Sequence, residues 1–315
     1  MKILISDKTS PKCAEILRKA GHQVEEKFGI EQDELLSIIV EYDGLIVRSA
    51  TKVTREIIEA GKNLKVIGRA GTGVDNIDIE TATERNIVVM NTPGANTNAV
   101  VELILAYILS LGRHLYQASK SLKDGRWEKK KLVGTEVSGK TLGIIGCGRI
   151  GRQVAMKSQC LGMEVICYDP YVGREIIDKF GVKLVANMDE VLKESHYISI
   201  NIPKTPETIN YIAKQEFEKM QKGVYFINCS RGGIVNEKDL FWALNEGIVA
   251  AAGIDVFVTE PPRNQQLVQH PNVMCTPHLG ASTVEAQENV GIQIAEQIVD
   301  MFAGREIRNQ VKLKK

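Results

Sequence analysis

Three ionisable residues in the last third of the chain have the types and positions that acid–base chemistry on a small organic acid requires. Arg231, Glu260 and His278 each follow a short apolar run that is typical of a buried strand. The Arg231 guanidinium can hold a carboxylate through two parallel hydrogen bonds and polarise the adjacent carbonyl. The His278 imidazole can give a proton to a nascent alkoxide and take it back, while Glu260 would orient the ring and favour its charged form. These three residues predict hydride chemistry at carbon 2 of a small 2-hydroxy or 2-keto acid.

A glycine motif in the middle of the chain predicts the site of the hydride carrier. Gly146, Gly148 and Gly151 form G-x-G-x-x-G directly after the apolar run Thr141–Ile145, and a helical pattern follows. Asp169 lies 23 positions after Gly146, at the end of the next apolar run, close to the spacing of about 20 that dinucleotide-binding motifs show. Its carboxylate can accept hydrogen bonds from both ribose hydroxyls of NAD and would repel the 2′-phosphate of NADP. The motif therefore predicts NAD as the cofactor.

The elements that would position these residues alternate along the chain. Short β-branched runs that predict strands are separated by amphipathic helical patterns, an order typical of α/β proteins with parallel sheets covered by helices on both faces. The expected strands are 3–6, 44–47, 65–67, 87–90, 141–145, 165–168, 197–202, 224–228 and 252–256. Because catalytic loops of such sheets follow the carboxyl ends of strands, Arg231, Glu260 and His278 are expected to lie in one crevice. A long helix over 98–122 marks the domain boundary, and periodicity alone does not assign the last helix, 283–302, to either domain.

Composition limits the class of protein. A chain of 315 residues exceeds what one core usually serves, and a net charge of +1 gives no electrostatic signature for nucleic acid or an anionic membrane. Six cysteines without a C-x-x-C pair support neither a metal site nor a disulfide framework. The N-terminal apolar run is too short for a signal sequence, and the longest one, 100–111, contains Glu102. We expect a cytoplasmic protein without a bound metal.

The chain resembles the D-isomer-specific 2-hydroxyacid dehydrogenase family over essentially its whole length. The segments that carry the resemblance are GLIVRSATKVT (44–54), GRAGTGVDNID (68–78), MNTPG (90–94), DGRWE (124–128), the glycine motif with YDP (168–170), NCSRGGIV (228–235), DVF (255–257) and PHLGAST (277–283). One departure is Asn201-Ile202-Pro203, where family members often have His-x-Pro, and it puts one cofactor contact near Ile202 in doubt.

The resemblance implies specific roles for residues of this chain. Arg231 and Glu260 would be active-site residues and His278 the proton donor. The residues implied in cofactor binding are Thr72, Gly146, Gly148, Arg149, Ile150, Gly151, Asp169, Cys229, Arg231, Asp255, His278 and Gly280. The residues implied in substrate binding are Arg48, Ser49, Arg69, Gly71, Arg231 and His278, and a lysine run, 129–131, would add positive charge for a phosphate.

The resemblance also implies a fold, an assembly and a substrate. A Rossmann NAD-binding domain, 99–283, would be inserted in a flavodoxin-like substrate-binding domain formed by 1–98 and 284–315. The helix 98–122 and the arm after it would build a homodimer or a larger assembly. The substrate would be D-3-phosphoglycerate, oxidised to 3-phosphohydroxypyruvate in the first step of phosphorylated serine biosynthesis. Because the sequence stops at Lys315, we expect no C-terminal regulatory domain and no feedback inhibition by serine through one.

Two other functions are left open at this point. A glyoxylate or hydroxypyruvate reductase, or another D-2-hydroxyacid dehydrogenase, would share every catalytic residue and need no phosphate site. A more remote alternative is an NAD-sensing, corepressor-like protein without catalytic activity, since a fold alone does not establish a function.

Overall fold

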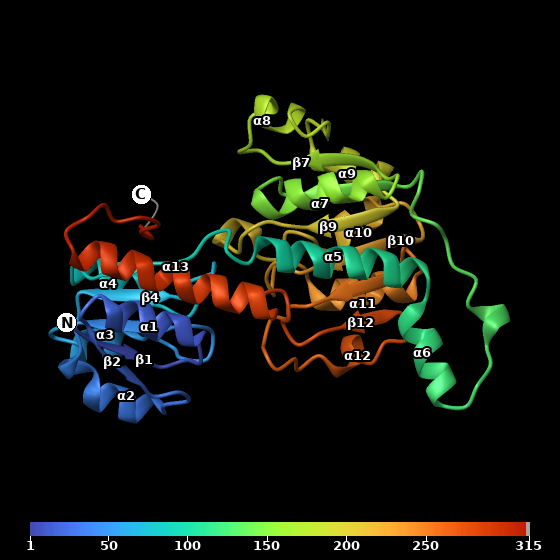
Figure 1. Cartoon of the computed structure of the whole chain (residues 1–315). Coiled ribbons are helices and arrows are strands. Elements are labelled where there is room, and N and C mark those ends of the chain that lie inside the picture. Colours follow the sequence, from blue (N-terminus) through green and yellow to red (C-terminus); the bar gives the residue numbers. More distant parts are fainter. Residues whose placement is uncertain (313–315) are drawn as a thin grey trace. The chain divides into compact units, whose positions relative to one another are not determined.

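The computed structural model describes residues 1–312 and divides the chain into two compact units, Met1–Thr97 with Ala281–Lys315 and Asn98–Gly280 (Figure 1). Each unit contains one parallel sheet with helices on both faces. The α/β class with two doubly wound parallel sheets is therefore confirmed. The expected domain boundaries, at 98/99 and 283/284, lie one and three residues after those of the units.

The first unit contains a five-stranded sheet in the order β2-β1-β3-β4-β5. This is the flavodoxin-like order, in which the chain reverses direction across the sheet between β1 and β3. Loops after the carboxyl ends of these two strands therefore meet at a crevice where such sheets bind ligands. The strands are β1 (Lys2–Ile5), β2 (Gln23–Glu26), β3 (Gly44–Val47), β4 (Val66–Arg69) and β5 (Val88–Met90).

Alternation along each strand separates the core of this unit into two layers. On β1, Leu4 packs with one layer, and Ile3 and Ile5 pack with the other, because successive side chains point to opposite faces. The Leu4 face is covered by α2 (Gln32–Ile38), η1 (Ile39–Glu41), α3 (Arg55–Ala60) and α4 (Ile79–Glu84). The other face is covered by α1 (Pro11–Lys19) and α13 (Val284–Phe302).

A glycine on β4 allows the last helix to pack closely against this sheet. A Cβ added at Gly68 on β4 would lie 2.7 Å from Ile294 Cγ1 and 2.9 Å from Ile298 Cδ1, distances that real carbon contacts do not reach. Gln297 of α13 is buried and donates a hydrogen bond of 3.1 Å to the Asn91 carbonyl. Close packing and a buried polar contact thus attach a helix from the end of the chain to its N-terminal unit.

The second unit contains a seven-stranded sheet in the order β12-β11-β10-β9-β6-β7-β8. Its first strand in sequence, β6, stands at the switch point between β9 and β7, as in dinucleotide-binding sheets. The strands are β6 (Thr141–Ile145), β7 (Glu164–Tyr168), β8 (Lys183–Leu184), β9 (Tyr197–Ile200), β10 (Val224–Asn228), β11 (Val249–Ile254) and β12 (Val273–Cys275).

Helices cover both faces of this sheet as well. One face packs against α5, α7 and α8, and the other against α9 to α12. Tyr107 lies so close to β11 that a Cβ at Gly253 would be 2.5 Å from its ring. The helices are α5 (Thr97–Gly112), α6 (Leu115–Lys123), α7 (Arg149–Cys160), α8 (Arg174–Asp178), α9 (Met188–Glu194), α10 (Lys214–Lys219), α11 (Glu237–Asn245) and α12 (Gln265–Val268), with short 3-10 turns η2 (Lys129–Lys131) and η3 (Pro206–Thr208).

The prediction of one continuous helix over 98–122 is wrong. The chain forms α5 and α6, bent by 67° at a break where His114 adopts a left-handed φ of 52°. The Gly112 carbonyl accepts a hydrogen bond of 2.8 Å from Thr135 N instead of continuing the helix. Among the described residues no single helix is long and apolar enough to cross a membrane, and α5 with α6 would meet that criterion only as a bent pair.

The sequence patterns did not predict two edge strands, β2 and β8. β2 has the polar sequence QVEE, and β8 has only two residues. Both lie at sheet edges, where a strand buries one side or neither and needs no apolar run. Their strand conformation depends on pairing with β1 and β7, which local sequence does not reveal.

Candidate active site

His278 and Glu260 form a hydrogen-bonded pair. His278 Nδ1 lies 2.8 Å from Glu260 Oε2, and the side chains are 46% and 40% exposed. Glu260 Oε1 accepts a second hydrogen bond, 3.2 Å long, from Phe257 N. A carboxylate at Nδ1 favours the tautomer with the proton on that nitrogen, which leaves Nε2 open to a substrate. The pair therefore has the arrangement of a general acid–base and its orienting carboxylate.

The backbone of His278 is held in an uncommon conformation. Its φ is 55°, in the left-handed region where a residue with a Cβ is rarely found. Asp255 holds this turn through three hydrogen bonds. Its carbonyl oxygen accepts from His278 N at 2.9 Å, and its carboxylate accepts from Leu279 N at 2.6 Å and from Gly280 N at 2.9 Å. Thr276 Oγ1 donates to the same carboxylate at 2.5 Å.

Asp255 is completely buried, and burial raises the pKa of its carboxyl while the donors of Thr276, Leu279 and Gly280 oppose that shift. Thr276 Oγ1 is also hydrogen-bonded to the hydroxyl of Tyr107 on α5, at 2.6 Å. The predicted cofactor residue Asp255 thus has a structural task that the sequence did not reveal. It fixes the turn that presents His278.

Arg231 follows β10 in a turn stabilised by Asn228. Asn228 Oδ1 accepts hydrogen bonds from the Ser230 amide and hydroxyl, at 3.0 and 2.7 Å, and its Nδ2 donates to the Arg231 carbonyl at 3.3 Å. The half-buried guanidinium donates from Nη1 to the Ser230 carbonyl at 2.7 Å. The next residue, Gly232, packs directly on the neighbouring loop, because a Cβ there would lie 1.7 Å from the Phe257 carbonyl oxygen.

The three predicted catalytic residues therefore come from one unit and one edge of one sheet. Arg231 follows β10, Glu260 follows β11 and His278 follows β12, and these strands are neighbours. Cys229 begins the Arg231 turn and is buried, which raises the pKa of its thiol well above the ordinary value. It is accordingly a neutral side chain beneath the site.

The glycine motif has the geometry of a dinucleotide cradle. Gly146 has φ 96°, and a Cβ there would lie 2.6 Å from the Asn201 carbonyl oxygen; at Gly151 it would lie 2.1 Å from the Gly146 oxygen. At Gly148 nothing lies within 4 Å of the added atom. The first and third glycines are thus needed for packing, whereas the second leaves open space for a ligand.

The start of α7 fits an anionic group. Gly148 is the residue before the helix and supplies no side-chain hydrogen bond to its first amides. Arg149 and Ile150 form the first turn, and the helix dipole favours a negative charge there. The residues present therefore fit the diphosphate of NAD at this helix start.

Asp169, the predicted ribose-binding residue, lies beside the glycine loop. It ends β7, is half-buried, and accepts hydrogen bonds from Cys147 N at 2.7 Å and Tyr171 N at 2.9 Å. A carboxylate has about four acceptor positions, so these two donors leave capacity for ribose hydroxyls. The same hydrogen bonds tie the glycine loop to the end of β7.

The predicted substrate residues of the first unit lie at the ends of two neighbouring strands, with Arg69 as the last residue of β4 and the others in the loops that follow. Arg48 and Ser49 follow β3, and the loop is held by Asp7, whose carboxylate accepts from Arg48 N at 2.6 Å and from Thr51 Oγ1 at 2.7 Å. Asn76 Nδ2 donates to the carbonyls of Arg48 and Thr51, at 2.8 and 2.7 Å. Burial lowers the pKa of the Arg48 guanidinium, and Asp7 counteracts this effect.

The second of these loops follows β4. Gly71 has φ 154°, and a Cβ there would coincide with the guanidinium of Arg69, only 1.4 Å from Nη1. Thr72 is the one predicted cofactor residue in this unit. Its carbonyl oxygen accepts a hydrogen bond of 2.6 Å from Asn91 Nδ2, and its hydroxyl donates to Asn96 Oδ1 at 2.9 Å. The lysine run forms the exposed turn η2 of the other unit, where Lys131 pairs with Glu128 at 3.0 Å.

Sequence reasoning missed the residues that hold the loops. Asp7 and Asn76 fix the Arg48 loop, and Glu237 on α11 accepts a hydrogen bond of 2.7 Å from Val258 N in the Glu260 loop. Asp7 does carry one signal, because it directly follows an apolar run as Asp169 does. For Asn76 and Glu237 the local sequence gives no such signal, since both partners are distant along the chain.

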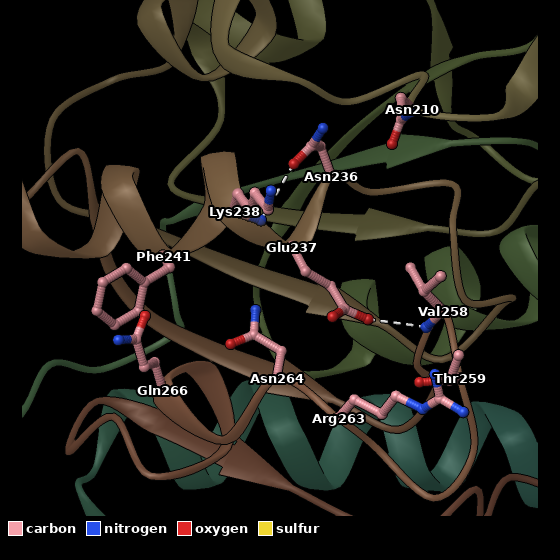
Figure 2. Close-up of a pocket in the computed structure, with 10 residues that line it drawn as sticks. All are labelled: Asn210, Asn236, Glu237, Lys238, Phe241, Val258, Thr259, Arg263, Asn264 and Gln266. Carbon is pink, nitrogen blue, oxygen red and sulfur yellow. Dashed lines mark hydrogen bonds between the residues drawn. The ribbon is translucent and has the colours of Figure 1, made fainter.

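A cavity of about 710 Å³ adjoins the Glu260 loop in the second unit (Figure 2). It is lined by the start of α11, the loop after β11 and α12, and Figure 2 shows the hydrogen bond from Val258 to Glu237 along its wall. Its lining residues are Asn210, Asn236, Glu237, Lys238, Phe241, Val258, Thr259, Arg263, Asn264 and Gln266.

Comparison with known proteins agrees with this geometry. Residues 105–280 match the family model of the D-isomer specific 2-hydroxyacid dehydrogenase NAD binding domain. The D-3-phosphoglycerate dehydrogenase of Archaeoglobus fulgidus is 48% identical over 314 residues, which cover 99% of this chain and 59% of the relative. The chain thus spans about three fifths of the length of the curated relatives it matches.

Two solved structures are similar over nearly their whole length. The NAD+-bound 3-phosphoglycerate dehydrogenase of Entamoeba histolytica has a TM-score of 0.84 and 32% identity, covering 100% of this chain and 99% of that one. A glyoxylate reductase from Paecilomyes thermophila has a TM-score of 0.90 and 29% identity, covering 99% and 98%. Together with the family model, these likenesses show that the chain belongs to the D-isomer specific 2-hydroxyacid dehydrogenases.

Proposed function

We propose that this chain is an NAD-dependent dehydrogenase that oxidises D-3-phosphoglycerate to 3-phosphohydroxypyruvate, the first step of phosphorylated serine biosynthesis. The observation that carries the proposal is the 2.8 Å contact of His278 with Glu260 in the same unit as the glycine cradle and Asp169. The choice of substrate is supported by relatives of 45–48% identity that are named D-3-phosphoglycerate dehydrogenase.

The residues of the chain have distinct tasks in this reaction. Arg231 binds the substrate carboxylate and directs the 2-hydroxyl toward His278. His278 Nε2 takes the hydroxyl proton during oxidation and returns it during reduction, while Glu260 keeps the ring in place at Nδ1. NAD, when bound at Gly148, the first turn of α7 and Asp169, supplies the hydride acceptor. Arg48 and the lysines of η2 are proposed to meet the phosphate.

A rate assay on purified protein tests the substrate. NADH consumption is followed with 3-phosphohydroxypyruvate, hydroxypyruvate and glyoxylate in parallel. We expect kcat/KM to favour the phosphorylated acid by about 100-fold or more, because charges built to meet a phosphate are left unpaired without it. Arg48→Ala should reduce this preference and leave the rate with hydroxypyruvate less affected.

The second candidate, a glyoxylate or hydroxypyruvate reductase, is favoured by the likeness to the glyoxylate reductase structure. It would be supported by equal or greater kcat/KM for an unphosphorylated acid. If NADH bound and none of the three acids reacted, an NAD-sensing protein would become the leading function.

The proposed assembly is a homodimer in the cytoplasm. Apolar side chains of α6 and the following segment are exposed, among them Trp127 at 80%, Val133 at 79% and Leu122 at 58%. A second copy of the same segment would cover them through a two-fold axis. Sedimentation velocity should give a dimer for the wild type and a monomer for Trp127→Ser/Leu122→Ser; a monomeric wild type would refute the assembly.

A further inference from the structure

We propose that Glu237 is a positioning residue for the Glu260–His278 pair. The inference builds on the proposed function, because the pair is taken to transfer the substrate proton. Glu237 lies on α11, away from the catalytic turn, and acts through the loop that carries Glu260. Nothing in its sequence position or in the family likeness assigns it this role.

The first step is a direct contact between α11 and the Glu260 loop. Glu237 is the first residue of α11, and its Oε1 accepts a hydrogen bond from Val258 N at 2.7 Å. The adjacent amide, Phe257 N, donates to Glu260 Oε1 at 3.2 Å. Two consecutive amides thus connect the two carboxylates. A movement of Val258 moves Phe257 and with it the support of Glu260.

The second step is the packing on the other side of the same two residues. A Cβ on Gly232 would lie 1.7 Å from the Phe257 carbonyl oxygen and 2.8 Å from Val258 N. The segment 257–258 is therefore held between the Arg231 turn and the Glu237 carboxylate. This arrangement joins the turns of Arg231 and Glu260. The proposed reaction requires these two side chains to keep a fixed distance and orientation.

The third step concerns what lies beyond the loop. The cavity of about 710 Å³ borders Val258, Thr259 and Arg263, so this side of the loop faces open space (Figure 2). The Val258 side chain is 54% exposed and adds little packing. On this side of the loop, the 2.7 Å hydrogen bond to the Glu237 carboxylate holds the Val258 backbone, and such charge-assisted hydrogen bonds are short and strong.

A purely structural role for Glu237 makes a different prediction. An acid in the first turn of a helix is favourable because of the helix dipole, and that effect needs its charge. The proposed role needs an acceptor atom at Oε1. Glu237→Gln removes the charge and keeps an amide oxygen in the same place, whereas Glu237→Ala removes both. Lys238→Ala is the matched control, since this exposed residue lines the same cavity in the same turn.

The experiment combines kinetics with a direct view of the histidine. For 2-keto acid reduction we expect Glu237→Ala to lower kcat by about 10-fold, with the KM for NADH unchanged, because loss of alignment acts on the chemical step. Glu237→Gln and Lys238→Ala should stay within about 3-fold of the wild type.

Proton–nitrogen correlation spectra of the five histidine rings provide the second readout. The His278 signals are identified by their loss in His278→Ala. In the wild type and in Glu237→Gln we expect the neutral ring to carry its proton on Nδ1, and in Glu237→Ala a mixture of both tautomers.

The outcomes separate this inference from the proposed function. Unchanged His278 signals in Glu237→Ala would overturn the positioning role whatever the enzyme turns over. Equal losses in Glu237→Gln and Glu237→Ala, or in Lys238→Ala, would overturn it in favour of a general effect on α11. If the wild type reduced no 2-keto acid while the tautomer still responded only to Glu237→Ala, the positioning role would stand and the proposed function would fail.

Discussion

The residue proposed to move the proton occupies a conformation that costs free energy. A left-handed φ of 55° at His278 costs about 1–3 kcal/mol in a residue with a Cβ. The hydrogen bonds from the backbone of His278, Leu279 and Gly280 to Asp255 offset this cost. The turn that carries His278 is thus fixed by Asp255, and the imidazole ring itself is held by Glu260.

Replacement of this imidazole should affect chemistry and spare cofactor binding. We expect His278→Ala to lower kcat by about 100- to 10,000-fold, the usual contribution of a general acid–base. The Kd for NADH, measured by fluorescence titration, should change little because the glycine cradle and Asp169 are untouched. Unchanged turnover would remove His278 from the proton-transfer role.

Asp169 should determine the preference for NAD over NADP. We expect Asp169→Ala to reduce the ratio of kcat/KM for the two cofactors by about 10-fold or more, because the carboxylate no longer repels the 2′-phosphate. Since Asp169 also accepts from Cys147 N and Tyr171 N, Asp169→Asn is the control that keeps an oxygen acceptor. An unaltered ratio in both variants would argue against contact with the ribose.

At the scale of elements, one short helix of the first unit, α4, has a side-chain cap. α4 has six residues and begins after Asp78, whose Oδ1 accepts a hydrogen bond of 2.9 Å from Thr81 N. This backbone hydrogen bond lowers the pKa of Asp78. Because Val53 N bonds to Asn76 O and Asp78 N bonds to Val53 O, the start of α4 is continuous with the loop that holds Arg48.

We expect Asp78→Ala to lower the free energy of unfolding by about 1 kcal/mol at neutral pH, the usual loss for such a cap. A lowered pKa in the folded state stabilises the fold above the ordinary carboxyl pKa, and this stabilisation is lost as pH falls through the folded value. The charge of Asp78 contributes less to the free energy of unfolding than the hydrogen bond of the cap, because water screens a partly exposed carboxylate. Urea titrations followed by circular dichroism should show the difference at neutral pH and its decrease below pH of about 4. Asp78→Asn should behave like the wild type near neutral pH, and a difference that grows in acid would contradict the argument.

At the scale of the whole molecule, tryptophan fluorescence distinguishes the two units. Both tryptophans, Trp127 and Trp242, belong to the second unit, so tryptophan fluorescence reports its unfolding. A ligand that binds only the folded state stabilises it by about 2.7 kcal/mol at 100 times its Kd.

We therefore expect NAD to raise the midpoint of thermal unfolding followed by tryptophan fluorescence. The rise should be smaller for NADP and for the Asp169→Ala protein, because both lack the favourable carboxylate–ribose contact. An absence of any rise with saturating NAD would refute cofactor binding by this unit.

The sequence by itself determined the class of fold and the types of functional groups. Buried parallel strands need continuous apolar runs, and loops at strand ends need glycine or polar residues, so both leave local patterns. The glycine motif, Asp169 and the candidate catalytic residues Arg231, Glu260 and His278 could all be recognised in this way. Family resemblance added the Rossmann and flavodoxin-like domain folds, and the strand orders of the two sheets confirm them.

Only the tertiary structure decided how these groups are held. The break between α5 and α6 depends on Thr135 reaching the Gly112 carbonyl, and β2 exists because β1 is available to pair with it. Glu237 and Asp7 act on loops 21 and 41 residues away along the chain. Hydrogen bonds and packing between distant segments leave no periodic pattern in sequence, because each depends on the position of a partner that folding alone brings near. For that reason the chemistry could be read from the residues, and its alignment could be read only from the folded chain.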